Sequence, residues 1–110
     1  MEISVERAEN YVVLRPEGRL NMVAAPRLRS SIEGVVQDGS TRVVLDLGGV
    51  SFMDSSGLGA VIAGLKRARQ AGGDLRLAAV GEQVQTVMRL TNLDRVLRPH
   101  ETVRDAADGW

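Results

Sequence analysis

Apolar residues recur along this chain at two different spacings, which predict strands in some segments and helices in others. Ile3 and Val5 alternate with polar residues, and a second β-rich run covers residues 11–14. Turn-forming residues lie between the two runs, so the pattern predicts an antiparallel hairpin. Pro16 predicts that the second strand ends, bulges or lies at an edge, because proline cannot donate a hydrogen bond to a sheet. Residues 18–22 are then expected to form a loop.

A helical spacing follows this loop. Pro26 suits the first position of a helix, where a backbone N–H is not needed. The next apolar residues fall at i, i+4, i+7 and i+8 and form one stripe, made of Leu28, Ile32, Val35 and Val36. Asp38 and Gly39 are predicted to end this helix. The segment is therefore expected to pack one apolar face on a sheet.

The stretch from residue 43 to residue 65 is the one around which the chain is organised. It begins with the apolar run 43–47, which predicts a buried strand, and passes through a glycine-containing loop. It then continues as a helix with an apolar stripe at Leu58, Val61, Ile62 and Leu65. In an open α/β sheet, binding sites collect outside the carboxyl ends of the strands. The loop before this helix is therefore the first candidate for a functional site.

The rest of the chain continues the alternation of strands and helices. Residues 75–79 predict a strand, and residues 84–88 belong to a third helix that ends near Asn92. Residues 96–97 are a short strand candidate, and the apolar spacing over 103–110 predicts a last helix that docks on the body. Strands that alternate with helices call for parallel pairing with right-handed crossovers. We expect one α/β domain over residues 1–110, with a mixed, mostly parallel β-sheet, the N-terminal antiparallel hairpin and about four helices.

Composition narrows the possible functions. Hydrophobic residues make up 44% and charged residues 25%, as in ordinary globular domains. The 14 basic and 14 acidic residues cancel, and this balance argues against nucleic-acid binding. The absence of cysteine excludes disulfides and thiolate chemistry. The first residues are unlike a signal peptide, and no apolar run approaches the ~20 residues of a membrane span, so we expect a cytoplasmic protein without membrane association.

Enzyme chemistry finds little support in the residue pattern. Ser55 and Ser56 lie where a helix begins, but neither has the glycines two places away on both sides that a nucleophile elbow needs. The only histidine, His100, is expected in a C-terminal loop. Gly57 and Gly59 open the helix without the spacing or the lysine of a phosphate-binding loop. We predict no catalytic residue, no metal site and no cofactor, and a small hydrolase or nucleotide-binding enzyme is a disfavoured alternative.

The residues alone favour a simple structural role for Asp54, Ser55 and Ser56. Their side chains can accept hydrogen bonds from unpaired backbone amides, so they would act as a helix N-cap. Met53 could belong to the core, or it could form an exposed contact at a loop tip. Met22 is most simply a loop residue.

A family resemblance changes this interpretation. Leu45-Asp46-Leu47, followed by the run Val50-Ser51-Phe52-Met53-Asp54-Ser55-Ser56-Gly57-Leu58-Gly59, strongly resembles the STAS domain of bacterial anti-sigma factor antagonists. Residues 18–21, 24–28, 72–75 and 84–97 are also similar to the family, so the resemblance covers nearly the whole chain.

The resemblance implies a partner switch. Such antagonists carry one serine, directly after the motif aspartate, which a partner serine kinase phosphorylates. By position this serine is Ser55. The kinase has a GHKL-type ATP site and is also an anti-sigma factor. The bare antagonist binds the kinase and frees its other client, whereas the phosphorylated form releases the kinase until a PP2C-type phosphatase removes the phosphate.

The resemblance also implies roles for the neighbours of the acceptor. Asp54 would help to position Ser55 and contact the kinase, and Ser56 and Gly57 would form the helix start beside it. Gly57 and Gly59 would leave room for another backbone or a nucleotide to approach.

Further partner contacts are expected at Asn21, Met22 and Met53. Asn21 stands at a loop position where many relatives have aspartate, which leaves its own contact open. We expect the free protein to be a monomer that is a kinase substrate and not an enzyme. The alternative is a STAS scaffold or adaptor subunit of a stressosome-like or transporter-associated complex. The absence of an extra sensory domain and the intact Asp-Ser-Ser-Gly-Leu-Gly run argue against it.

Overall fold

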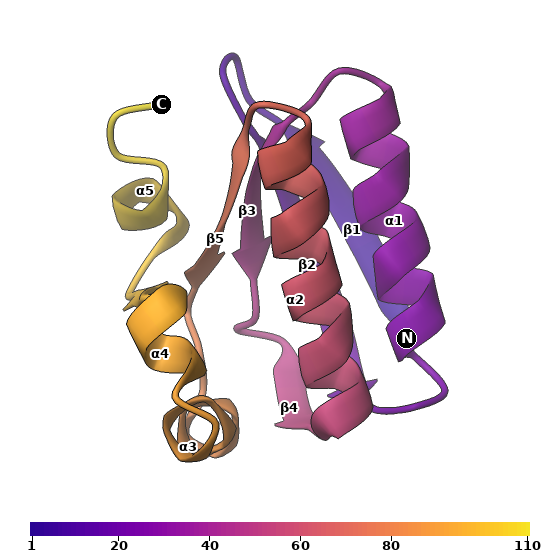
Figure 1. Ribbon diagram of the computed structural model, residues 1–110, viewed down its shortest axis with the longest axis vertical. Helices are drawn as coiled ribbons and strands as arrows, with labels where there is room; N and C mark the ends of the chain where they lie inside the picture. The colour runs from indigo at the N-terminus through magenta and orange to yellow at the C-terminus, as the bar shows by residue number, and fades with distance from the viewer.

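The structure, a computed structural model that describes residues 1–110, contains six strands and five helices (Figure 1). They follow in the order β1 (Glu2–Arg7), β2 (Val12–Leu20), α1 (Ala25–Gln37), β3 (Arg42–Asp46), β4 (Val50–Met53), α2 (Ser55–Gln70), β5 (Asp74–Ala78), α3 (Glu82–Leu90), α4 (Leu93–Val96), β6 (Pro99–His100) and α5 (Val103–Ala106). The prediction of a single α/β domain is confirmed.

The sheet has the strand order β1-β2-β3-β5-β6, and β4 pairs with β2 away from this row. β1 and β2 are antiparallel, with Val5 opposite Leu14, and every other pair is parallel. The predicted hairpin and the mostly parallel sheet are therefore confirmed. Helices α1 and α2 lie side by side over one face of the sheet and run in the same direction (Figure 1).

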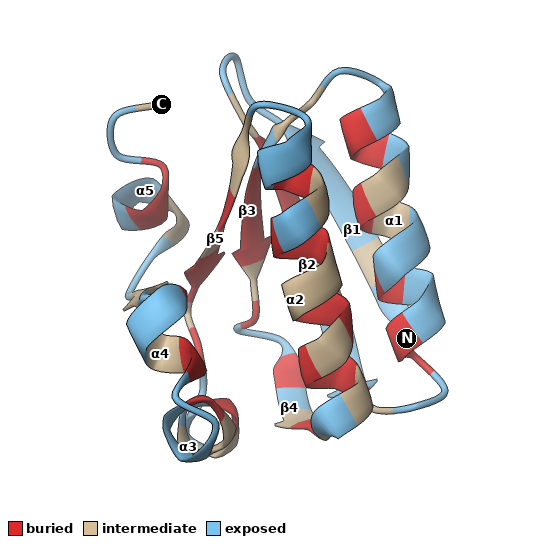
Figure 2. Cartoon of the chain, in the orientation of Figure 1, coloured by how far each residue is buried: buried red, intermediate tan, exposed pale blue.

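The core lies mainly between the sheet and helices α1 and α2 (Figure 2). All four residues of the predicted α1 stripe are buried, and strand residues such as Val12, Leu14 and Leu45 face them. On the other face Val13, Val44 and Ala78 pack against α5 and its flanking residues. Burial on both faces explains why β2 and β3 carry continuous apolar runs in place of an alternating pattern.

The second strand continues past Pro16, so the prediction of a loop over residues 18–22 is wrong for residues 18–20. Residues 12–14 of β2 pair with β3, whereas residues 18–20 pair with β4 after a register shift between Gly18 and Arg19. Pro16 lies in the interval that pairs with neither, so its missing N–H interrupts no hydrogen bond on the parallel side. β2 changes partners at this point and reaches the loop before α1.

Three short elements differ from the sequence prediction. Residues 50–53, expected within a loop, form strand β4. Val96 ends the short helix α4, and the last strand is formed by Pro99 and His100 beside β5. His100 is therefore in a strand and not in a loop.

Arg15 ties the first three strands together on the sheet surface. Its guanidinium lies 2.6 Å from Glu6 Oε1 and 3.1 Å from Asp46 Oδ2. The hydrogen bond to Glu6, supported by the charges of Glu6 and Asp46, raises the pKa of Arg15 although partial burial acts in the opposite direction. The group remains charged at any pH at which the protein is folded, so this link adds no pH dependence near neutrality.

Candidate functional site

Ser55 is the first residue of α2 and is exposed to solvent. Helix α2 begins at the lower edge of the molecule in Figure 1. The backbone N–H groups of Ser55 and Ser56 have no hydrogen-bond acceptor within the chain. The first turn of α2 contains no acidic residue. The hydroxyl of Ser55 thus lies at the positive end of a 16-residue helix, beside two amide N–H groups that could donate hydrogen bonds to an added anion.

Asp54 holds the start of α2 in place. Its Oδ1 accepts a hydrogen bond from the Gly57 N–H at 2.9 Å, which confirms the predicted N-cap role. Its Oδ2 accepts a second one from the Met22 N–H at 3.2 Å. Because both carboxylate oxygens bind backbone groups of this chain, Asp54 fixes the loop before α1 against the start of α2. Ser55 lies between Asp54 and Gly57, within the turn that this cap closes.

Asn21 fixes the same loop from its other end. Its Oδ1 accepts hydrogen bonds from the N–H groups of Val23 and Ala24, both at 3.1 Å. Met22 and Val23 are thereby held on an ordered turn, with 71% and 84% of their surface exposed. The sequence pattern did not single out Val23, because a valine between Met22 and two alanines resembles a core residue. Met22, Val23, Ser55 and the half-buried Ser56 form what we call the acceptor surface.

Two of the predicted contact residues are buried. Met53 is 2% exposed, and Gly57 also lies below the surface. A Cβ at residue 57 would overlap the carbonyl oxygen of Leu20 and lie 2.8 Å from the Leu20 Cγ. The space that Gly57 leaves is therefore filled by β2 of this chain, and the expectation that it admits a partner is wrong. Neither Met53 nor Gly57 presents a side chain to a partner.

A residue that the sequence did not single out lies behind the site. Gln83, the second residue of α3, accepts a hydrogen bond from the Met53 N–H at 2.8 Å and donates one to the Met53 carbonyl at 3.0 Å. No sequence signal could reveal this contact, since a glutamine on an amphipathic helix normally faces water.

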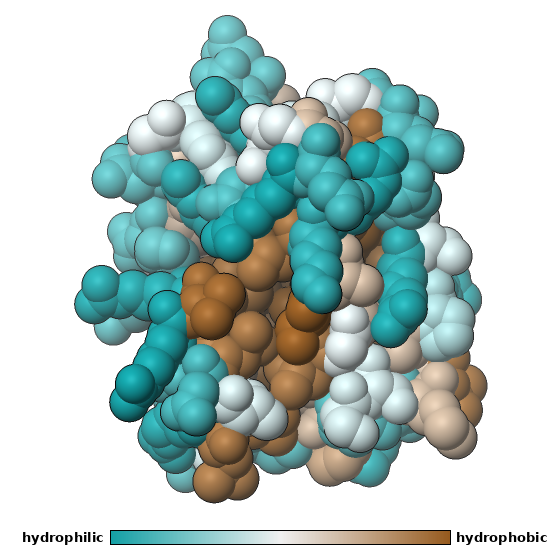
Figure 3. Space-filling view, in the orientation of Figure 1, coloured by the Kyte–Doolittle hydropathy of each residue, from teal (hydrophilic) through white to brown (hydrophobic).

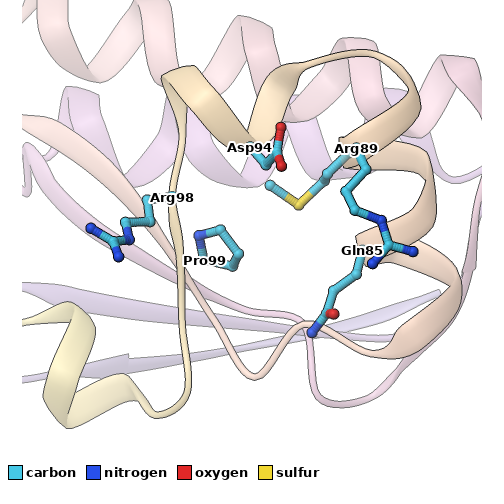
Figure 4. Close-up of a pocket in the computed structure, with 6 residues that line it drawn as sticks. Gln85, Arg89, Asp94, Arg98 and Pro99 are labelled. Carbon is cyan, nitrogen blue, oxygen red and sulfur yellow. The ribbon is translucent and has the colours of Figure 1, made fainter.

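The five main pockets are not lined by Ser55 or by its neighbours. One of about 330 Å³ is lined by Gln85, Met88, Arg89, Asp94, Arg98 and Pro99 (Figure 4). It contains no predicted site residue and no serine, histidine or cysteine that could act as a nucleophile or base. No cluster of three or more histidine, cysteine or acidic side chains could hold a metal ion. None of the helices is both long and apolar enough to span a bilayer.

Replacing Asp54 tests the two hydrogen bonds that organise the site. We expect Asp54→Ala to lower the free energy of unfolding by about 1–2 kcal/mol, because it removes the N-cap and the acceptor for Met22. Asp54→Asn keeps an oxygen that can accept from the Gly57 N–H, so it should lower the free energy of unfolding by less than Asp54→Ala does. Urea denaturation of the three proteins measures the difference, and equal stability of Asp54→Ala and the wild type would contradict this role.

Sequence and structure comparisons identify the family. The STAS domain model matches residues 2–106. A Thermotoga maritima protein provisionally assigned as an anti-sigma factor antagonist is 30% identical over 101 residues, which cover 91% of this chain and 89% of that protein. The crystal structure of an anti-sigma factor antagonist from Mycobacterium paratuberculosis has a TM-score of 0.85 and 30% identity, and the match covers 96% of this chain and 89% of that one.

The phosphorylated form of SpoIIAA, described as a Bacillus cell fate determinant, is similar over 97% of both chains, with a TM-score of 0.74 and 25% identity. The match to the family model and the relatives named anti-sigma factor antagonists therefore agree with the resemblance of the Asp54-Ser55 segment. The chain belongs to the STAS domain family.

Proposed function

We propose that this protein is an anti-sigma factor antagonist that is switched by phosphorylation of Ser55. The observation that carries the proposal is the exposed Ser55 hydroxyl at the start of α2, beside an ordered apolar turn formed by Met22 and Val23. The names of the similar proteins support the antagonist function, and one similar structure is of a phosphorylated form. The protein is then a kinase substrate and binding module, with no catalytic residue of its own.

In this proposal the unphosphorylated protein binds a GHKL-type serine kinase that is also an anti-sigma factor, and this binding releases the sigma factor. The apolar side chains of Met22 and Val23 dock on the kinase and bring Ser55 to its ATP site. Asp54 keeps these two parts of the acceptor surface in register through its hydrogen bonds to the Met22 and Gly57 N–H groups. The switch operates in the cytoplasm, without nucleic acid or membrane contact by this chain.

Phosphorylation reverses the binding. A phosphoserine carries a charge of about −1.5 to −2 at neutral pH. Placed on Ser55, this charge faces a partner site that already holds ATP phosphates, so it repels the kinase. Within the free chain the same charge is accommodated by the unpaired amides at the start of α2. A PP2C-type phosphatase can then remove the phosphate from the exposed side chain and restore binding.

Replacing Met22 tests the docking part of the acceptor surface. We expect Met22→Ala to weaken kinase binding roughly tenfold, as truncation of an interface anchor commonly does. Leu90→Ala is the matched control, because Leu90 is 80% exposed on α3 and lies outside the acceptor surface. Neither substitution should shift the melting temperature much. Titration by isothermal calorimetry checks the prediction, and equal losses in the two variants would contradict it.

A competition experiment tests the function as a whole. The kinase is mixed with its sigma factor, and the unphosphorylated protein is then added while sigma-factor release is followed by gel filtration. Release by the wild type and by Ser55→Ala, but not by the phosphorylated protein, is the expected result. Formation of a large homo-oligomer without release would favour the scaffold alternative.

A further inference from the structure

Gln83 makes a two-point contact with the last residue of β4. Its side-chain amide accepts from the Met53 N–H at 2.8 Å and donates to the Met53 carbonyl at 3.0 Å. Met53 is directly followed by Asp54, the N-cap, and by Ser55. The contact therefore lies two residues before the proposed phosphorylation site.

The position of this contact explains what it does for the sheet. β4 pairs with β2 alone, through residues 18–20, and has no strand on its other edge. The Met53 N–H and carbonyl point to that free edge, where each would need a partner because Met53 is 2% exposed. Gln83 supplies both partners at once, as a neighbouring strand would. Helix α3 thereby closes the open edge of β4.

The start of α2 is thus held from both sides. On one side the Asp54 N–H donates to the Leu20 carbonyl of β2, and the Asp54 carboxylate accepts from Met22. On the other side Gln83 fixes the residue before Asp54. Removal of the Gln83 amide would leave β4 attached by one edge only, so the backbone that carries Ser55 would gain freedom.

We propose that Gln83 is a positioning residue for the phosphorylation of Ser55, acting through the backbone of Met53. This inference rests on the proposed function of Ser55. A kinase must hold an acceptor hydroxyl in line with the γ-phosphate, and a displacement of about 1 Å can cost a large factor in rate. Gln83 limits that displacement from a helix that does not itself belong to the acceptor surface.

The test compares Gln83→Met with the matched control Gln85→Met. Methionine keeps the length of glutamine but forms neither hydrogen bond. Gln85 is on the same helix and its side chain donates only to the Val80 carbonyl at 3.0 Å, so its replacement leaves β4 untouched. Amide hydrogen exchange of Met53, Asp54 and Gly57, whose N–H groups are all hydrogen-bonded, is measured by NMR. The kinetics of phosphorylation are measured with the kinase and Mg-ATP.

In Gln83→Met we expect exchange at Met53 to accelerate roughly tenfold, in line with the loss of one to two net hydrogen bonds. The kcat for phosphorylation should fall roughly tenfold with little change in KM, because the docking residues Met22 and Val23 are intact. Gln85→Met should match the wild type in both measurements. If Gln83→Met does not fold, Gln83→Glu replaces it, since a carboxylate can still accept from the Met53 N–H but loses the donor and repels the Met53 carbonyl.

Unchanged exchange at Met53 and Asp54, whose N–H donates to the Leu20 carbonyl, would overturn the contact itself. Faster exchange with unchanged kcat would overturn the positioning role. If the wild type is not phosphorylated on Ser55 at all, the proposed function fails, and the exchange of Asp54 and Gly57 alone decides whether Gln83 orders this segment.

Discussion

The protein phosphorylated on Ser55 is expected to bind the kinase about a thousandfold more weakly than the bare protein, yet to melt at the same temperature or slightly higher. The phosphate meets the unpaired N–H groups of Ser55 and Ser56 and the positive end of the α2 dipole, worth about 0.3–1 kcal/mol in exposed positions. The core residues of α2, such as Leu58 and Val61, point into the molecule and do not contact it.

Binding responds differently because the partner cannot accommodate the added charge. A thousandfold loss of affinity corresponds to about 4 kcal/mol, enough to operate a switch. Circular dichroism melts of both forms check the melting temperature, and kinase titrations of both forms check the affinity. Trp110 is the only tryptophan, and the Arg76 Cζ lies 3.9 Å from the centroid of its ring. Its fluorescence therefore reports whether α5 stays packed. Loss of the cooperative melt would mean that the switch works by unfolding.

A large loss of stability is expected from Gly57→Ala. The new Cβ would overlap the backbone carbonyl of Leu20. Because the overlap is between the first turn of α2 and the backbone of β2, no flexible side chain can move away to relieve it. We expect a loss of about 3 kcal/mol or more in the free energy of unfolding, and a melting temperature lower by roughly 10 °C or more.

Gly59→Ala is the control, because Gly59 lies two residues further along the same helix. A Cβ there would lie 3.6 Å from Arg29 Nη2, an ordinary contact. Alanine in a helix interior is favoured over glycine by about 0.5–1 kcal/mol, so this variant should be slightly more stable than the wild type. Thermal and urea denaturation of both variants give the sign of each change in the free energy of unfolding. A neutral Gly57→Ala would show that β2 and α2 are less closely packed than described.

The sequence predicts the elements whose pattern is local. The stripe of α1, the strand 43–47 and the helix after Asp54 have enough apolar residues in register to be recognised without a partner. Strand β4 escapes prediction because four residues carry little periodicity, and its hydrogen bonds come from β2 and from Gln83, both distant in sequence. The strand β6 is shorter still, two residues placed by their pairing with β5.

Some residues of the candidate site have a local sequence signal, and others are placed only by long-range contacts. Asp54 and Ser55 follow from the start of a helix after a strand, which is a local signal. The burial of Met53 and the exposure of Val23 depend on how β2, β4 and α3 meet, so apolar character alone cannot assign either residue. Leu90 of α3 and Val96 of α4 are exposed apolar residues, and no sequence motif marks them. Figure 3 shows an apolar surface between α2 and α4 that the sequence pattern also does not indicate.

The central claim, that Ser55 is the residue that the kinase modifies, is tested most directly by mapping the phosphate. The protein is incubated with its kinase and Mg-ATP, and the products are analysed by intact-mass and peptide mass spectrometry, with Ser55→Ala and Ser56→Ala in parallel. We predict one phosphate, located on Ser55, in the wild type and in Ser56→Ala, and none in Ser55→Ala. A phosphate on Ser56, with Ser55→Ala still a substrate, would contradict the claim.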